Sequence, residues 1–297
     1  MNTMLERLVQ VLQQRAPRPG DSMELQRAQF EQLAGQAAPV PGVDVAAISL
    51  AGLNAERLTP RESDPSRTLL WLHGGGYVMG SLDTVRPLAS RLACAIGAPV
   101  LTLDYRLAPV HPHPAALDDA VAAYHALVGE GYSPSRLAIG GDSAGGGLAV
   151  ASLVALRNEG ARLPAAGVCL SPWVDLTMTA ASYDAPTAFD PQAPRWQLTE
   201  MARCYLAGAD PATPSASPRF ADLTGLPSLL IHVGGAEKLL DDATALAGMA
   251  RAAGVDVTLE CPQDMLHVWH AFAPKLPEAV AAIERVGRWL RARWAQQ

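Results

Sequence analysis

The chain has 297 residues, with 29 acidic and 23 basic side chains that give a formal net charge of -6 at pH 7. This length suits one large α/β domain, and the lack of any basic run argues against a nucleic-acid partner. No apolar stretch reaches the length of a signal-sequence core or of a membrane span, so we expect a cytoplasmic protein. The four cysteines show no close pairing and are predicted to be reduced core residues.

The first 40 residues are predicted to form two helices. Apolar residues recur there at helical spacing: Leu5, Leu8, Val9 and Leu12. A Pro-rich break at residues 17–20 separates them from a second helix over residues 22–33. An amphipathic helix at a membrane surface or against a partner is the alternative interpretation, although the polar face is not strongly basic.

A glycine-rich loop follows the first strongly apolar strand. The strand Thr68–Leu72 runs directly into His73-Gly74-Gly75-Gly76-Tyr77. Backbone N–H groups in such a loop can stabilise the negative charge that develops on an ester carbonyl oxygen during acyl transfer. We predict this role for Gly74, Gly75 and, further along the chain, Ala144. A phosphate-binding loop is disfavoured, because Met79 stands where G-x-G-x-x-G needs its third glycine.

Helical and strand patterns then alternate. We expect helices over residues 83–96 and 114–128 and strands over residues 100–104 and 137–140. This alternation predicts an α/β fold with a mostly parallel sheet flanked by helices. His111-Pro112-His113 lies between these elements without further ligands at metal-binding spacing, so we expect no metal.

The strongest motif is Gly141-Asp142-Ser143-Ala144-Gly145. It connects the strand at 137–140 to a predicted helix over residues 144–159, which a strand over residues 166–170 follows. A strand, a sharp turn with flanking glycines and a helix are typical of a nucleophile elbow, which exposes the serine hydroxyl. Ser143 is therefore the candidate nucleophile.

A carboxylate that orients the catalytic base is expected after the strand at 228–233. Glu237 lies in the loop that follows this strand, and it is our choice because its position suits the role. Asp241 and Asp242 come one helical turn later, where a helix N-terminus favours carboxylates in any case. Asp264 is a further candidate, although a turn role is the simpler explanation for it.

The base is expected after the acid in the chain, which leaves three histidines. His232 lies within an apolar run and is predicted to be a core residue. His267 follows the strand predicted at 255–259 and a short loop, so it is our choice for the base; His270 is the alternative. A closing amphipathic helix is predicted over residues 277–295.

The chain resembles the bacterial hormone-sensitive-lipase family of esterases, which are α/β-hydrolases, over nearly its whole length. The residues that carry the resemblance are His73–Tyr77, Asp104–Pro109 with His111-Pro112 and Pro114–Ala116, Gly141–Gly146, and Met265–His267. The resemblance implies Ser143 as nucleophile, His267 as base and a scaffolding role for Asp104 and Arg106. It places Glu237 where the family usually has Asp, which is a departure.

The resemblance also implies a single domain over residues 1–297, with residues 1–40 and 182–217 forming a cap over the serine. The expected activity is hydrolysis of short- to medium-chain acyl esters, without a cofactor and with a small-molecule ester as partner; the family allows a homodimer through the last strand and helix. An amidase or deacetylase of a small acylated metabolite would use the same residues. A ligand-binding protein without catalysis is the third hypothesis, and it usually lacks one of these motifs.

Overall fold

The computed structural model describes residues 3–34, 39–185 and 191–296. Within these ranges one eight-stranded sheet has the order β1-β2-β4-β3-β5-β6-β7-β8. Its strands are β1 (Val43–Leu50), β2 (Leu53–Pro60), β3 (Thr68–Leu72), β4 (Val100–Leu103), β5 (Leu137–Asp142), β6 (Ala166–Leu170), β7 (Ser228–His232) and β8 (Val257–Glu260). All neighbouring pairs from β4 to β8 are parallel, which confirms the predicted mostly parallel sheet.

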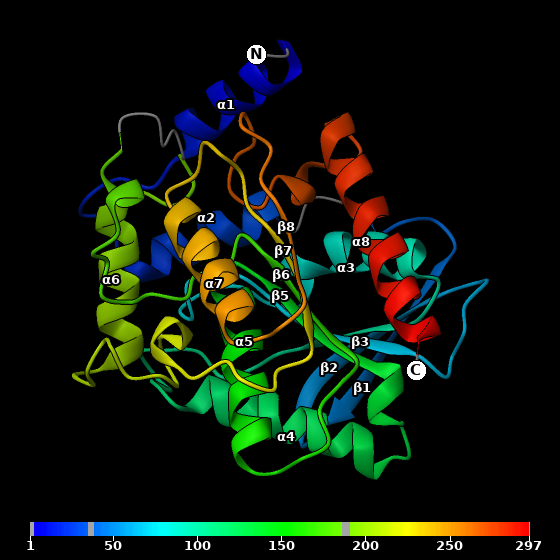
Figure 1. Ribbon diagram of the computed structural model, residues 1–297. Coiled ribbons are helices and arrows are strands. Elements are labelled where there is room, and N and C mark those ends of the chain that lie inside the picture. The colour runs from blue at the N-terminus through cyan, green and yellow to red at the C-terminus, as the bar shows by residue number, and fades with distance from the viewer. Residues whose placement is uncertain (1–2, 35–38, 186–190, 297) are drawn as a thin grey trace.

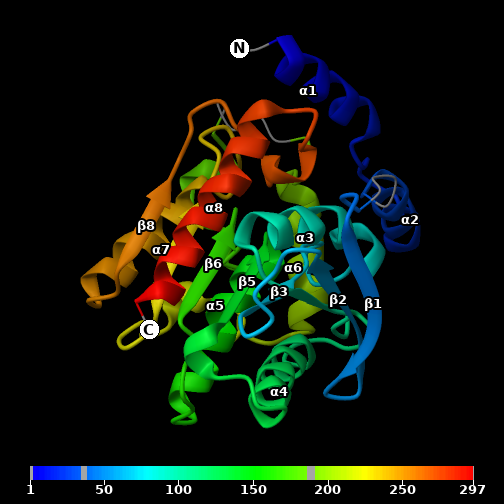
Figure 2. The same ribbon diagram turned by 90° about the vertical axis from the view of Figure 1, so that its right-hand side faces the viewer.

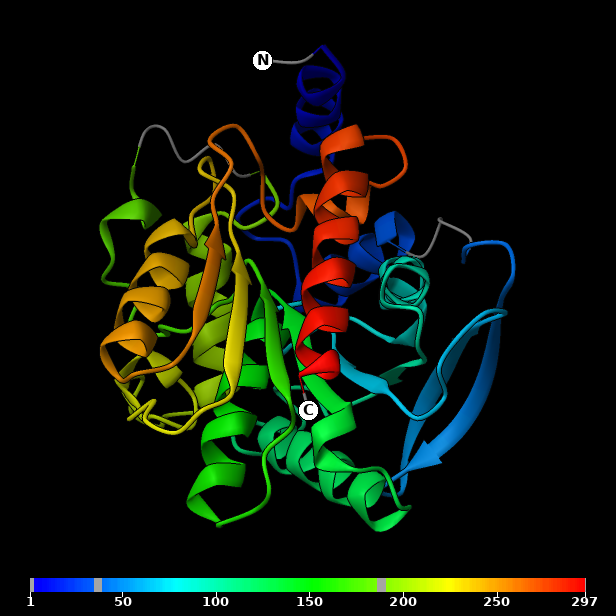
Figure 3. The same ribbon diagram turned by 45° about the vertical axis from the view of Figure 1, so that its right-hand side comes forward.

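Helices cover both faces of the sheet (Figures 1 and 3). They are α1 (Thr3–Arg15), α2 (Met23–Ala34), α3 (Leu82–Ile96), α4 (Ala115–Gly129), α5 (Ala144–Asn158), α6 (Arg195–Leu206), α7 (Leu240–Ala252) and α8 (Pro277–Ala295). Helices α3 and α8 pack together in front of the sheet in Figure 2, whereas α4 and α5 pack together on the opposite face. Two apolar cores result, one on each side of the strands.

The hairpin of β1 and β2 was not predicted from the sequence. The two strands pair in an antiparallel register from Val43 with Pro60 to Leu50 with Leu53, and β2 joins the sheet antiparallel to β4. The connecting turn has positive φ at both Ala51 and Gly52. Such turns usually show Asn-Gly or Asp-Gly, and polar residues interrupt both β1 and β2, so neither the turn chemistry nor a fully apolar strand marked this edge of the sheet.

The two predicted N-terminal helices are present as α1 and α2. Helix α1 projects at the top of Figures 1 and 2 and buries Leu5 and Leu12. Helix α2 contacts α6 through an amide pair, in which Gln197 Nε2 donates to Gln26 Oε1 at 2.8 Å. Segments 35–38 and 186–190, which belong to the two predicted cap segments, lie outside the described residues. No described helix is long and apolar enough to cross a membrane.

The prediction that all four cysteines lie in the core was wrong for two of them. All four are free thiols, but Cys94 and Cys261 are exposed, whereas Cys169 is buried and Cys204 is half-buried. Helical periodicity turns Leu92 and Ile96 of α3 inward and leaves Cys94 on the solvent side. Cys261 directly follows the edge strand β8 and is therefore open to solvent.

Candidate active site

Ser143 occupies the sharp turn between β5 and α5. Its backbone has φ +55°, which is strained for a residue with a side chain. The neighbouring β3 ends beside this turn, and a Cβ atom on Gly141 or Gly145 would clash with the Leu72 carbonyl there. The predicted elbow therefore depends on both glycines, because the carboxyl end of β3 approaches the turn so closely.

Ser143, His267 and Glu237 form one hydrogen-bonded series. His267 Nε2 lies 2.9 Å from Ser143 Oγ, and His267 Nδ1 lies 2.8 Å from Glu237 Oε2. The three side chains come from three separate connections: β5 to α5, β7 to α7, and the loop after β8. Glu237 is fully buried, while Ser143 and His267 retain 8% and 7% exposure. A hydroxyl, an imidazole and a carboxylate in this order can activate the hydroxyl as a nucleophile.

The Glu237 carboxylate is held from its other side. Its Oε1 atom accepts a hydrogen bond from Ser171 Oγ at 2.8 Å and another from the Gly234 N–H. One oxygen is thus fixed by the protein, and the other is directed at His267. This arrangement explains how a buried glutamate can hold one orientation.

None of the rival carboxylates is hydrogen-bonded to His267, whose Nδ1 faces Glu237. Asp242 is buried and accepts hydrogen bonds from the Val174 and Asp175 N–H groups and from the Tyr183 hydroxyl. Asp241 accepts from the Ser182 N–H at 2.8 Å. Asp264 is exposed on the loop before His267.

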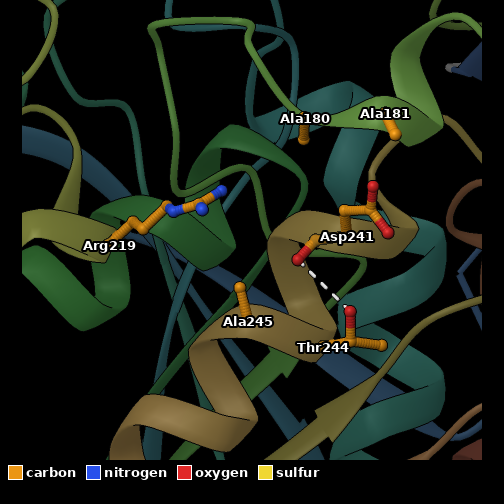
Figure 4. A pocket seen from close by; sticks show the side chains of 6 residues that line it. All are labelled: Ala180, Ala181, Arg219, Asp241, Thr244 and Ala245. Atoms are coloured by element: carbon orange, nitrogen blue, oxygen red, sulfur yellow. Dashed lines mark hydrogen bonds between the residues drawn. The ribbon is translucent and has the colours of Figure 1, made fainter.

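Asp241 also lines a surface pocket of about 460 Å³ (Figure 4). The other lining residues are Ala180, Ala181, Arg219, Thr244 and Ala245. Ser143, His267 and Glu237 do not line this pocket, so Asp241 faces a different part of the surface.

Three other histidines are buried and favour the neutral state. Burial lowers the pKa of His73 and of His232 to about 4, and it holds the pKa of His270 well below its usual value. His232 Nδ1 lies 3.0 Å from His270 Nε2, so these two ring nitrogens form a hydrogen bond with each other. The prediction that His232 is a core residue is confirmed, and the alternative base His270 is directed at His232.

The glycine loop differs from the prediction at Gly74. The Gly74 N–H donates to Asp142 Oδ2 at 3.1 Å, so it is not free to meet a developing oxyanion. Among the described residues, no hydrogen bond uses the N–H of Gly75, Gly76 or Ala144. Ala144 is the first residue of α5, where backbone N–H groups have no partner within the helix. The free donors are therefore one position further along the loop than the motif suggested.

Asp142 is a site residue that sequence reasoning missed. It accepts from Trp71 Nε1 at 3.0 Å as well as from Gly74, and thereby ties the end of β3 to the elbow. Burial raises the pKa of Asp142 to about 6. Its place next to Ser143, at the carboxyl end of a parallel strand, was the available signal.

The segment around Asp104 and Arg106 contacts the glycine loop through Tyr105. The Tyr105 hydroxyl donates to the His73 carbonyl at 2.7 Å, and the Tyr105 ring stacks on the His73 ring at 4.2 Å. Arg106 forms a bidentate pair with Asp119, in which Nε donates to Oδ2 and a terminal guanidinium nitrogen donates to Oδ1. These contacts are structural.

Comparison with known proteins decides the family. Residues 69–271 match a family described by the alpha/beta hydrolase fold. The sequence is 46% identical to that of an esterase from the bacterial hormone-sensitive lipase family whose crystal structure is known. The two structures superpose with a TM-score of 0.96, and the match covers 99% of each chain. The chain belongs to this family of α/β-hydrolases.

Other members of the family are similar over most of their length. An acetyl-hydrolase of Streptomyces hygroscopicus is 50% identical to this hydrolase over 252 residues, which is 85% of this chain and 83% of that protein. An esterase of Acinetobacter venetianus is 34% identical, over 82% of this chain and 80% of its own. The crystal structure of EstE5 soaked with p-nitrophenyl butyrate is 44% identical, with a TM-score of 0.95 and coverage of 99% and 100%.

In this hydrolase, residues from α2 and α6 contact the glycine loop. Arg27 of α2 donates to the carbonyls of Val78 at 2.6 Å and of Ala108 at 2.7 Å. A Cβ atom on Gly76 would clash with the sulfur of Met201, so this α6 side chain lies directly against the loop. Helices α2 and α6 therefore both contact the glycine loop or the residue that directly follows it.

A second α6 contact and the preceding segment extend this attachment. The Tyr205 ring of α6 stacks on the Tyr77 ring with centroids 3.9 Å apart. Gln192 Nε2 donates to the His267 carbonyl at 3.1 Å. The chain segment that leads into α6 thus contacts the hydrogen-bonded series as well. In the part of the chain that the structure describes, no group of three or more His, Cys, Asp or Glu side chains is arranged to hold a metal ion.

Asp242 should make the stability of this hydrolase depend on pH. Burial raises its pKa to about 7, from 3.8 in an unfolded chain. Between pH 4 and 7 the folded protein holds a proton that the unfolded chain has lost, so the free energy of unfolding falls as pH rises. In wild type, Asp242 should lower the free energy of unfolding by on the order of 3 kcal/mol between pH 4 and 7. Asp242→Asn should abolish this pH-dependent decrease.

Denaturant unfolding of wild type and Asp242→Asn at pH 5 and pH 8 measures this contribution. Asparagine can accept the Val174 and Asp175 N–H groups with its oxygen and donate to the Tyr183 hydroxyl, so the variant should fold. The stability of wild type relative to the variant should be lower at pH 8 than at pH 5. Parallel pH profiles for the two proteins would contradict the assignment.

Proposed function

We propose that this hydrolase cleaves short- to medium-chain acyl esters through a covalent acyl-enzyme on Ser143. It is a carboxylic ester hydrolase, as its family and its relatives named esterase and carboxylesterase indicate. The observation that carries the proposed mechanism is the hydrogen-bonded series of Ser143, His267 and Glu237. No cofactor takes part in this chemistry.

Ser143 Oγ attacks the ester carbonyl carbon while His267 Nε2 takes its proton. His267 then donates that proton to the departing alcohol, and the acyl group stays on Ser143. A water molecule next gives a proton to His267 and attacks the acyl carbon. His267 returns this proton to Ser143 Oγ as the acyl–oxygen bond breaks, which releases the carboxylic acid and restores the serine. Glu237 keeps His267 in the required tautomer and stabilises its charged form.

The N–H groups of Gly75, Gly76 and Ala144 are proposed to receive the negative charge on the carbonyl oxygen. They replace the predicted set of Gly74, Gly75 and Ala144, because Asp142 already engages Gly74. Fixed backbone donors of this kind contribute about 3 kcal/mol each in a serine protease. Asp142 would serve this step indirectly, by holding the loop against the elbow.

Residues 1–40 and 182–217 are proposed to cap the site within a single domain of residues 1–297. The contacts of Arg27 and Met201 with the glycine loop support this role. A side chain as large as Met201 beside Gly76 leaves little room for a long acyl chain. The acetyl-hydrolase among the relatives also favours a small acyl group.

Hydrolysis of p-nitrophenyl esters with 2 to 16 acyl carbons tests the proposed substrate class. We expect wild type to show its highest kcat/KM between 2 and 8 carbons and a loss of about 100-fold or more at 16 carbons. A single methylene that a closed pocket cannot accommodate already changes specificity by about 10- to 200-fold. Met201→Ala should move the preference toward longer chains, because it removes the side chain beside Gly76.

Thr199→Ala is the matched control, because Thr199 lies on the exposed face of the same helix. It should leave the chain-length profile unchanged. If Met201→Ala keeps the wild-type chain-length profile, the cap is not the cause of the preference for short chains. Turnover of the matching anilides in place of the esters would move the assignment to an amidase.

A homodimer through β8 and α8 and a cytoplasmic location are also part of the proposal. Strand β8 stands at one edge of the sheet, where its outer backbone groups can pair with a second copy. The four free cysteines favour a reducing compartment.

A further inference from the structure

Ser171 stands in a strained turn directly after β6. Its backbone has φ +48°, in the left-handed region that residues with side chains seldom adopt. The Ser171 N–H donates to the His232 carbonyl at 2.7 Å, which ties the turn to the neighbouring strand β7. The side chain is completely buried. Both its position and its direction are therefore fixed.

The Ser171 hydroxyl makes two hydrogen bonds that belong to different parts of the site. It donates to Glu237 Oε1 at 2.8 Å and accepts from the Val268 N–H at 3.0 Å. Val268 directly follows His267 and has a strained backbone of its own, with φ +45°. One oxygen atom thus connects the acid to the residue beside the base.

We propose that Ser171 is a positioning residue, whose hydroxyl fixes the Glu237 carboxylate and the loop of His267 relative to each other. The inference rests on the proposed function, in which Glu237 orients His267. The terminal torsion of a glutamate is broad, so the carboxylate needs partners to hold its plane. Without the hydroxyl, Glu237 Oε1 keeps only the Gly234 N–H, and the buried Val268 N–H loses its acceptor.

Ser171→Ala and Ser171→Gly test the inference together. Both remove the hydroxyl, but glycine also relieves the strain of the positive φ, so Ser171→Gly should unfold at a higher temperature than Ser171→Ala. We expect both variants to lose about 10- to 100-fold in kcat, with KM within about threefold of wild type. Equal losses in two variants of unequal stability would assign the effect to the hydroxyl.

A spectroscopic measurement separates positioning from a structural role. The proton between His267 Nδ1 and Glu237 Oε2 should give a low-field NMR signal in wild type, which Ser171→Ala and Ser171→Gly should shift or broaden. Ser152→Ala is the matched control, because Ser152 is also fully buried and its hydroxyl only donates to the Leu148 carbonyl of its own helix. The control should keep the wild-type kcat and signal.

Wild-type kcat or an unchanged signal in both Ser171 variants would overturn the inference. Such a result in the Ser171 variants would not affect the proposed function, provided that Ser143→Ala has lost its esterase activity. An active Ser143→Ala would instead refute the proposed function itself.

Discussion

Replacing Ser143 by alanine should lower kcat on p-nitrophenyl acetate by about 10⁴- to 10⁶-fold, the range seen when a serine hydrolase loses its nucleophile. Alanine has no hydroxyl for His267 to deprotonate, so an acyl-enzyme cannot form. The free backbone donors of Gly75, Gly76 and Ala144 are unchanged, and a small residual rate should remain. Steady-state kinetics with highly purified protein measures the loss.

A covalent label gives an independent measurement of the same assignment. A serine-directed sulfonyl fluoride should add one mass increment to wild type, on the peptide that contains Ser143, and none to Ser143→Ala. The variant should keep the wild-type melting temperature within a few degrees, since the change removes one partly exposed oxygen. Labelling at another serine, or a variant that keeps activity, would refute the proposed nucleophile.

Glu237→Gln should lower kcat by about 10³- to 10⁴-fold, as an amide in place of the orienting carboxylate does in a serine protease. Glu237 Oε2 faces His267 Nδ1, while Oε1 accepts from Ser171 and Gly234. A glutamine places its NH₂ group on one of these sides, where it meets another donor or imposes the wrong tautomer on His267. Kinetics at a saturating concentration of a short ester, with circular dichroism to verify the fold, tests this.

Three further substitutions make the Glu237 experiment specific. Glu237→Asp keeps the charge but shortens the side chain by one methylene, so it cannot reach His267 while keeping its contacts with Ser171 and Gly234; we expect a loss of about 10- to 100-fold. Asp241→Asn and Asp264→Asn should stay within about twofold of wild type, because neither side chain contacts His267. A large loss in either of these, with activity kept in Glu237→Gln, would transfer the role to that aspartate.

The strand and helix pattern between residues 68 and 295 was predictable because each element carries its own signal. Buried parallel strands such as β3 and β6 are short and mostly apolar, and the helices between the strands show helical periodicity. The hairpin of β1 and β2 lacks both signals, since polar residues interrupt each of its strands. Its pairing with β4 depends on a contact between segments some 45 residues apart along the chain.

The candidate site also contains features that were predictable from the sequence and others that were not. The hydrogen bonds that the predicted roles of Ser143, His267 and Glu237 require are present. Ser143 and His267 were predictable because each lies in a motif of neighbouring residues. Gly74 was chosen from the motif alone, and the motif does not say which N–H groups are free. That depends on Asp142, which lies 68 positions further along the chain.

By itself the sequence determined the order of strands and helices from residue 68 onward, the elbow at Ser143 and the glycine loop, since these depend on residues close together in the chain. Only the tertiary structure decided which carboxylate reaches His267, which loop amides are free and that Ser171 connects the acid to the base. Each of these depends on a distance of about 3 Å between side chains or amides from separate connections. Such distances are set by how the parallel strands align their carboxyl ends, and local sequence patterns carry no record of that alignment.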